Sequence, residues 1–392
     1  MSEQVFIIAA RRTPIGAFQG ALMGATGPQL ASAALRAALA DSRVPAEQID
    51  DVILGCVLPA GLGQAPARQA SLGADIPKSV PVTTINKVCG SGMRAAMLGS
   101  DSIRAGSARV VIAGGFESMT NAPYLLPKAR QGYRMGHGEI LDHMFYDGLQ
   151  NPYDGQMMGH FADATAKKYE FTRADQDAYA AESVRRAQAA CGNGSFSAEL
   201  TSVTVKTRKG DQVVDKDEPP FTVDISKIPN LKPAFSKDGT VTAASSSSIA
   251  DGAAAMVLAS ESAVRAVGAT PLARVVAYSS FAQAPEWFTT APAGAIKRVL
   301  EKAGWSAGQV DLYEINEAFA VVTMAAMRDV GLEHSRVNVN GGACALGHPI
   351  GATGARIMTT LIHALKRRGL KRGIASLCIG GGEATAIAVE IV

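Results

Sequence analysis

Ser91-Gly92-Met93-Arg94 and Thr353-Gly354-Ala355-Arg356 each open a helical run, and the second tetrapeptide follows the first at an offset of 262 positions. Each run leads into an apolar segment that ends in glycines, at residues 110–115 in one case and 374–382 in the other. A short apolar run that stops at glycines is typical of a buried strand. The chain therefore repeats a helix followed by a strand, and this repetition predicts its fold.

A second pair of matching positions supports the duplication independently. Gln48 corresponds to Gln309 and Asp50 to Asp311, both at an offset of 261, and an amphipathic helical pattern precedes each pair. Two nearly equal offsets from separate stretches are hard to obtain by chance. We therefore expect two similar half-domains in which strands and helices alternate, which is the pattern of a layered α/β fold.

The chain between the two copies has a different composition. It is rich in Pro, Gly, Tyr and Met, with a helical pattern near residues 173–190 and a β-like piece at 202–206. Long insertions of this kind in compact enzymes often form binding surfaces. We predict three parts: an N-terminal half at 1–119 that is completed by about 250–270, an inserted loop domain at 120–249, and a C-terminal half at 271–392.

Composition limits the possible functions. The 392 residues are 47% hydrophobic and 19% charged, as in ordinary globular proteins of about two domains. A net charge of +3 without a block of like charges argues against nucleic-acid binding. Neither a signal peptide nor an apolar stretch of about 18 residues is evident, so we expect a cytoplasmic protein without membrane contact. Five cysteines without CxxC or metal-ligand spacing predict neither disulfides nor a metal site.

Cys89 is the first candidate for chemistry. It stands directly before Gly90 and the helical run that opens at Ser91. The start of a helix offers free N–H groups and the positive end of the helix dipole, so we expect a lowered pKa for the Cys89 thiol. For this motif alone, a buried structural cysteine is an equal alternative.

His348 is the second candidate. Pro349 restricts its backbone to an extended conformation, and Gly347 and Gly351 leave space around it. An imidazole held at a loop end suits a general base or an oxyanion donor, although a structural histidine is the alternative. The remaining histidines lack such a setting, and we expect structural roles for them: His137, His143, His160, His334 and His363.

Two further motifs follow apolar strands. Cys378 ends a strand at a glycine turn, whereas the matching strand at 110–115 has no such thiol, which indicates specialisation of one copy. Asn316 could hold a water or an oxyanion, and Glu317 could orient a histidine, with an N-cap as the alternative for Asn316. A duplicated fold brings equivalent strand ends together, and thiol plus imidazole is the pairing for nucleophilic thioester chemistry.

At these residues the sequence resembles the thiolases over essentially its whole length. Residues 88–92 resemble the nucleophile loop, 316–319 the NEAF motif, 347–349 the GHP motif and 378–382 the CxGGG motif. The resemblance implies a five-layered α-β-α-β-α fold of two similar halves around a central helix layer. It also implies that the inserted loop domain helps to bind coenzyme A and to form a homotetramer, a dimer of dimers.

The resemblance further implies a role for each residue. Cys89 is the acylated nucleophile, and His348 activates it and donates to an oxyanion. Asn316 holds a water for that oxyanion hole, and Cys378 moves a proton at C2 of the second substrate. The N–H groups of Cys89 and Gly380 form a second oxyanion hole. Neither metal nor cofactor is implied, since coenzyme A is a substrate. The residues implied to contact coenzyme A or the acyl chain are Ser247, Met158, Phe235, Ala318, Phe319 and Leu149.

Departures from the family pattern surround the acyl site. Ser245 stands where many thiolases have Asn, and Met157 where bacterial acetoacetyl-CoA thiolases often have His. The implied reaction joins two acetyl-CoA into acetoacetyl-CoA and coenzyme A. A 3-ketoacyl-CoA thiolase of broader chain length in fatty-acid β-oxidation is the close alternative.

More distant alternatives fit less well. A condensing enzyme of the ketoacyl-synthase type would need His or Asn in place of Cys378. The intact set of Cys89, His348 and Cys378 argues against an acyl-CoA-binding protein without activity. A cysteine hydrolase has no use for a second essential thiol.

Overall fold

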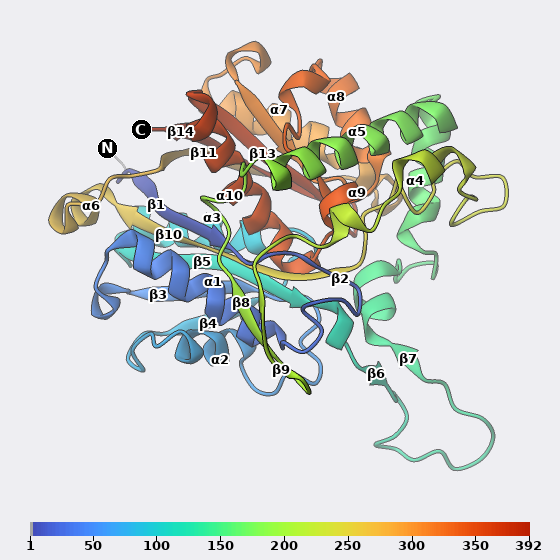
Figure 1. Cartoon of the computed structure of the whole chain (residues 1–392), viewed down its shortest axis with the longest axis horizontal. Helices are drawn as coiled ribbons and strands as arrows, with labels where there is room; N and C mark the ends of the chain where they lie inside the picture. The colour runs from blue at the N-terminus through green and yellow to red at the C-terminus, as the bar shows by residue number, and fades with distance from the viewer. Residues whose placement is uncertain (1–2) are drawn as a thin grey trace.

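The computed structural model describes residues 3–392, and a large sheet runs through it (Figure 1). The strand order is β12-β13-β14-β11-β1-β10-β5-β3-β4, with β2 paired to β10. The strands that come before α6 (Glu261–Val267) in the chain are β1 (Val5–Arg12), β2 (Gly16–Ala17), β3 (Asp51–Gly55), β4 (Val82–Ile85), β5 (Val110–Ser118) and β10 (Ala250–Ser260). Those that follow it are β11 (Ala273–Ala282), β12 (Leu312–Ile315), β13 (Arg372–Ile379) and β14 (Glu383–Ile391).

Strand pairing shows the predicted duplication. In the first half β3 pairs parallel with β5, and β5, β10 and β1 follow antiparallel. In the second half β12 pairs parallel with β13, and β13, β14 and β11 follow antiparallel. A parallel bridge between Tyr313 and Val337 takes the place that β4 holds in the first half. The strands of the two halves are hydrogen-bonded to each other over a short stretch, where Phe6 and Ile7 of β1 pair with β11.

The strands of the first half and those of the second half form two layers, and helices form the other three. One pair covers the outer face of the first half, one pair lies between the halves, and one pair covers the outer face of the second half. Separate apolar clusters fill the outer interfaces, and one shared cluster fills the middle, which confirms the predicted five-layered fold. The three pairs are α1 (Gly27–Ser42) with α2 (Pro66–Gly73), α3 (Ser91–Arg104) with α10 (Ile350–Arg368), and α7 (Ala291–Ala303) with α8 (Ala320–Val330).

The two central helices cross at glycines from both copies of the repeat. A Cβ added to Gly92 would lie 2.8 Å from the amide nitrogen of Ala355, and one added to Gly354 would lie 2.3 Å from that of Met93. Such distances leave no room for a side chain on either helix. The duplicated Gly in Ser-Gly-Met-Arg and Thr-Gly-Ala-Arg is therefore what lets α3 and α10 approach each other.

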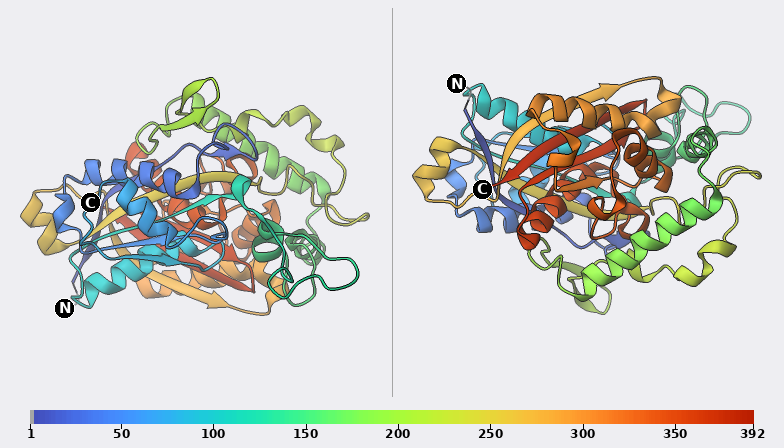
Figure 2. Two further views of the ribbon diagram at one scale, coloured as in Figure 1. Left: turned by 90° about the horizontal axis from the view of Figure 1, so that it is seen from below. Right: turned by 90° about the horizontal axis from the view of Figure 1, so that it is seen from above.

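The chain between β5 and β10 wraps around one side of the layers (Figure 2). The predicted helix is present as α5 (Arg173–Gly192), and the predicted β piece is present as β8 (Val203–Thr207). The segment between β6 and β7 projects away from the body in every view. The other elements here are β6 (Tyr124–Leu125), β7 (Leu141–Asp142), the π-helical turn η3 (Phe145–Leu149), α4 (Met158–Lys168) and β9 (Gly210–Val214).

A buried ion cluster ties this wrapping chain to the first half. Arg12 at the end of β1 bonds Glu199 at 2.5 Å and Asp217 at 2.7 Å, and all three side chains are buried. The remaining short elements are α6 (Glu261–Val267), α9 (Ala343–Leu346) and 3-10 turns at Ala46–Gln48, Met119–Asn121, Pro219–Phe221, Ile225–Asn230, Pro285–Thr290, Ala307–Gln309 and His334–Arg336. Across residues 3–392, we find no helix with the length and apolarity that a bilayer span requires.

Candidate active site

Cys89 lies in a strained loop between β4 and α3. The preceding residue, Val88, has φ of +47°, a left-handed conformation that β-branched residues avoid. Two side chains hold it there: Asn86 Oδ1 accepts from the Val88 amide at 2.8 Å, and Ser91 Oγ donates to the Val88 carbonyl at 2.7 Å. Strain of this kind costs about 1–3 kcal/mol and is typical of functional sites. The loop thus presents Cys89 at the start of the central helix.

The Cys89 thiol is not acidified, so the expected lowering of its pKa is wrong. Burial raises the pKa of Cys89 to about 11, and the charge of Glu117 adds to this effect. The N–H groups of Gly380 and of Cys89 itself donate to the sulfur and favour the thiolate, but they do not outweigh the loss of hydration. The position of the sulfur between these two amides is nevertheless the arrangement expected for an oxyanion hole.

Cys378 reaches the same place from the second half. It is buried at the end of β13, where burial and then the charge of Cys89 raise the pKa of its thiol well above the ordinary value. Contact between the two loops is close, since a Cβ on Gly90 would lie 2.4 Å from the Ile379 side chain. The structure therefore brings two protonated thiols together, one from each copy of the duplicated fold.

His348 is buried just before α10, and its surroundings select one tautomer. Its Nδ1 lies 2.6 Å from Thr353 Oγ1, and that hydroxyl donates its single proton to the Pro349 carbonyl at 2.9 Å. Nδ1 must then carry the proton and donate to Thr353, which leaves a lone pair on Nε2. Nε2 has no hydrogen-bond partner among the described residues. Burial and then the charge of Arg356 lower the pKa of His348 to about 3, so the ring is a neutral base.

Asn316 follows β12, and its side-chain amide is buried in an unusual setting. Its backbone N–H donates to the Ser376 carbonyl at 3.0 Å, which fixes it beside β13. Both the oxygen and the nitrogen of its buried amide lack a partner within the part of the chain that the structure describes. Buried amides are normally satisfied, so this one is available for a water or a substrate oxygen. The N-cap alternative is wrong, because α8 begins at Ala320 with Phe319 as its N-cap.

Glu317 does not orient a histidine, contrary to expectation. Its carboxylate accepts hydrogen bonds from Tyr179 at 2.9 Å, Ser183 at 2.7 Å and the Asn338 side chain at 2.8 Å. It also accepts from the Cys344 amide at 3.1 Å. Glu317 therefore joins α5, α9 and the end of β12 behind the site, whereas His348 is oriented by Thr353.

A cavity of about 180 Å³ opens beside His348. Five of the six residues predicted to contact coenzyme A or the acyl chain line it: Leu149, Met158, Phe235, Ser247 and Phe319. The sixth, Ala318, does not line the cavity but accepts a hydrogen bond from the Ser247 amide at 3.0 Å.

The thiols border this cavity rather than line it. Cys89 packs against the apolar cluster that includes Met119 and Ile350, and Cys378 belongs to the cluster that includes Phe319; Met119, Ile350 and Phe319 all line the cavity. The proposed nucleophile, the imidazole and the second thiol thus surround one small apolar space.

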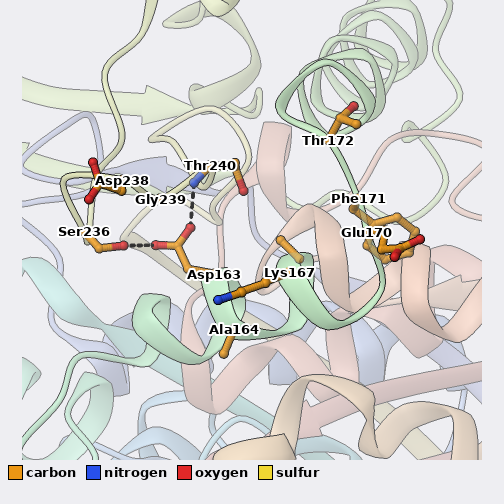
Figure 3. A pocket seen from close by; sticks show the side chains of 11 residues that line it. Asp163, Ala164, Lys167, Glu170, Phe171, Thr172, Ser236, Asp238, Gly239 and Thr240 are labelled. Atoms are coloured by element: carbon orange, nitrogen blue, oxygen red, sulfur yellow. Dashed lines mark hydrogen bonds between the residues drawn. The ribbon is translucent and has the colours of Figure 1, made fainter.

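A larger cavity of about 590 Å³ lies between α4 and residues 236–240 (Figure 3). Its lining in the described chain offers no thiol or imidazole, and it contains none of the predicted site residues. Its main feature is Asp163, which accepts from Ser236 at 2.6 Å and from the Thr240 amide at 2.8 Å. These bonds fix the segment that follows Phe235, so Asp163 supports one wall of the smaller cavity.

Sequence reasoning missed two residues of the site, Thr353 and Glu117. Thr353 could have been found, because it lies four residues after Pro349 in the helical run, where a threonine hydroxyl bonds back to that carbonyl and so lies beside His348. Glu117 gave no signal, since its partners come from distant loops. Within the described chain, no group of three or more His, Cys, Asp or Glu residues is placed to hold a metal ion.

The duplicated five-layer fold, with a thiol from each half beside a buried imidazole, defines a thiolase-type protein, and family comparison agrees. The model of the thiolase N-terminal domain matches residues 5–262, and that of the thiolase C-terminal domain matches residues 269–391. The chain belongs to the thiolase family.

Its relatives narrow the class further. The acetyl-CoA acetyltransferase of Pseudomonas aeruginosa is 48% identical over 387 residues, 98% of each chain. That of Schizosaccharomyces pombe is 44% identical over 392 residues, covering 100% of this chain and 99% of the relative. The crystal structure of the Bacillus anthracis acetyl-CoA acetyltransferase matches with a TM-score of 0.97 at 43% identity, over 100% of this chain and 99% of that one.

Proposed function

We propose that this chain is an acetyl-CoA acetyltransferase, which interconverts two acetyl-CoA with acetoacetyl-CoA and coenzyme A. The observation that carries the proposal is the meeting of two thiols, the half-buried Cys89 and the buried Cys378, beside an imidazole with a free Nε2. A carbon–carbon bond next to a thioester needs one sulfur to carry the acyl group and another base to remove the proton from C2. The full-length similarity to acetyl-CoA acetyltransferases supports the same reaction.

The first half-reaction acetylates Cys89. His348 Nε2 takes the thiol proton as the sulfur attacks the thioester carbonyl of acetyl-CoA. The developing oxyanion accepts hydrogen bonds from the N–H groups of Cys89 and Gly380, each worth roughly 3–4 kcal/mol. The carbon–sulfur bond to coenzyme A breaks, and the departing thiolate receives the proton from His348.

The second half-reaction forms the carbon–carbon bond. His348 Nε2 first takes the proton of the Cys378 thiol, and the Cys378 thiolate then removes a proton from C2 of the second acetyl-CoA. The enolate oxygen is stabilised by the N–H that His348 Nε2 has gained and by a water held on Asn316. C2 attacks the acetyl group on Cys89, the bond to the Cys89 sulfur breaks, the sulfur takes the proton back from His348, and acetoacetyl-CoA leaves. Since both half-reactions share Cys89, the kinetics are ping-pong.

Other features of the enzyme belong to the same proposal. It works without metal or prosthetic group, with coenzyme A as a substrate, in cytoplasmic lipid metabolism. It forms a homotetramer, a dimer of dimers, through the projecting segment between β6 and β7. Apolar side chains on and around that segment support this, since Tyr124 is 68%, Ile140 66% and Met135 96% exposed. Exposed apolar groups that gather in this way mark contact surfaces.

The test is the chain-length profile of thiolysis. A cavity of about 180 Å³ leaves little room beyond a short acyl group, so kcat/KM should be highest for acetoacetyl-CoA. A preference for chains of eight or more carbons would instead support the broader 3-ketoacyl-CoA thiolase. Mass spectrometry after incubation with acetyl-CoA should show an acetyl group on Cys89, and absence of that adduct would contradict the mechanism.

A further inference from the structure

Glu117 is a buried carboxylate close to the site that the mechanism above does not use. It lies at the end of β5 and is 1% exposed. One carboxylate oxygen accepts from the amides of Val57 and Gly351, both at 2.9 Å, and the other accepts from the Leu58 amide at 3.1 Å. These amides belong to the loop after β3 and to the first turn of α10, so Glu117 joins three separate elements.

Because the fold is duplicated, the amide that Glu117 binds has a counterpart in the first half. The offset of 262 that relates α3 to α10 also relates Cys89 to Gly351. The Cys89 amide faces its own sulfur and is free to serve the substrate, whereas the Gly351 amide is bonded to Glu117. A Cβ on Gly351 would lie 2.6 Å from a Glu117 carboxylate oxygen, so glycine is required there. Glu117 thus fills the second copy of the amide site that Cys89 uses in the first.

Two connections link Glu117 to the reacting groups. Gly351 lies three residues after His348, in the turn that also carries Ile350, and Ile350 lines the cavity. The negative charge of Glu117 also acts on Cys89 and raises the pKa of its thiol. Burial raises the pKa of Glu117 itself to about 7, while its three amide partners favour the charged form. The carboxylate is therefore ionised above about pH 8.

We propose that Glu117 is a positioning residue: its carboxylate holds the turn that follows His348 through the Gly351 amide, and its charge adds to burial in disfavouring the Cys89 thiolate before His348 Nε2 takes the proton. This proposal rests on the proposed function. The titratable groups placed around Cys89 are Glu117 from β5, Cys378 from β13 and His348 before α10, and Cys56 after β3 lies 3.6 Å from Glu117.

The test is alkylation of Cys89 by iodoacetamide in the full-length protein at pH 8–9, followed on the Cys89 peptide by mass spectrometry. Glu117→Gln removes the charge, so alkylation should become about three- to tenfold faster at a given pH. Glu314→Gln is the matched control, because Glu314 is also buried and pairs with Arg356 at 3.0 Å. It should leave the rate for Cys89 at the wild-type value. An unchanged rate in Glu117→Gln, or an equal increase in both variants, overturns the electrostatic role.

Glu117→Asp separates position from charge and keeps the proposal testable if the glutamine variant does not fold. Aspartate keeps the charge but is too short to reach all three amides. We expect wild-type alkylation of Cys89 together with a fall in kcat of at least about tenfold and little change in KM. A wild-type kcat overturns the positioning role. Alkylation does not need turnover, so a wild-type protein that lacks thiolase activity would contradict the proposed function while Cys89 reactivity is still measured.

Discussion

Replacing Thr353 by valine tests how His348 is prepared for proton transfer. Valine keeps the shape of threonine but lacks the hydroxyl that accepts from His348 Nδ1 at 2.6 Å. The ring then has a buried N–H without a partner, which costs about 1–3 kcal/mol. The tautomer with its lone pair on Nε2 is no longer favoured, so that free energy is added to the barrier for proton removal from Cys89.

The expected effect follows from that free energy. A barrier higher by about 1–3 kcal/mol slows acetylation of Cys89 by about 5- to 150-fold. KM for acetyl-CoA should change little, because the Thr353 side chain does not line the cavity. The measurement is the burst of coenzyme A released when enzyme is mixed with acetyl-CoA in a stopped-flow instrument.

Thr353→Ser is the matched control, since it keeps the hydroxyl and removes only a methyl group. It should acetylate within a few-fold of the wild-type rate. If valine and serine variants react equally fast, Thr353 does not select the tautomer, and the assignment of His348 Nε2 as the base loses its structural basis. The thermal midpoints of both variants show whether a general loss of stability accounts for any difference.

Three further predictions concern other parts of the site. Cys378→Ser should still take an acetyl group onto Cys89 but fail in condensation and thiolysis, and near wild-type acetoacetyl-CoA formation would disprove its role. Asp163→Asn should raise KM for coenzyme A several-fold with little change in Cys89 acetylation, because Asp163 fixes the Ser236 segment at 2.6 Å; an unchanged KM would contradict this. The pKa of His348 is lowered to about 3, so the ring is neutral above that value, and acetylation should show no loss of rate near pH 6.5 on acidification. A titration centred near 6.5 would refute a buried neutral base.

Much of the fold could be predicted from the sequence because the same packing requirement selects the same residue type at equivalent positions of the two copies. Gly92 and Gly354 occupy equivalent positions because each helix must pass the backbone of the other. The exception is the counterpart of β4, which is reduced to one bridge at Val337 in the second half. Its residues carry no strand pattern, so only the three-dimensional structure shows the correspondence.

The site was only partly predictable, for two physical reasons. Motifs identify Cys89 and His348, but a pKa depends on burial by distant segments, which is why the predicted direction for Cys89 was wrong. In addition, the side chains of two adjacent residues in an extended chain point to opposite faces. Asn316 presents an unpartnered amide, whereas Glu317 points back toward α5. The prediction that Glu317 orients a histidine was therefore wrong, although Glu317 is next to Asn316 in the sequence.

The titration of the two reacting groups limits how the first step can occur. The pKa of the Cys89 thiol is raised to about 11 and that of His348 is lowered to about 3, so transfer of the proton at rest is unfavourable by on the order of 10 kcal/mol. A preformed thiolate–imidazolium pair is thus not the resting state. Two amide donors to an oxyanion contribute roughly 3–4 kcal/mol each, a comparable total, but only when a carbonyl oxygen accepts from Cys89 and Gly380. Proton transfer must therefore accompany attack on a bound thioester, and the sulfur becomes nucleophilic only when its substrate is in place.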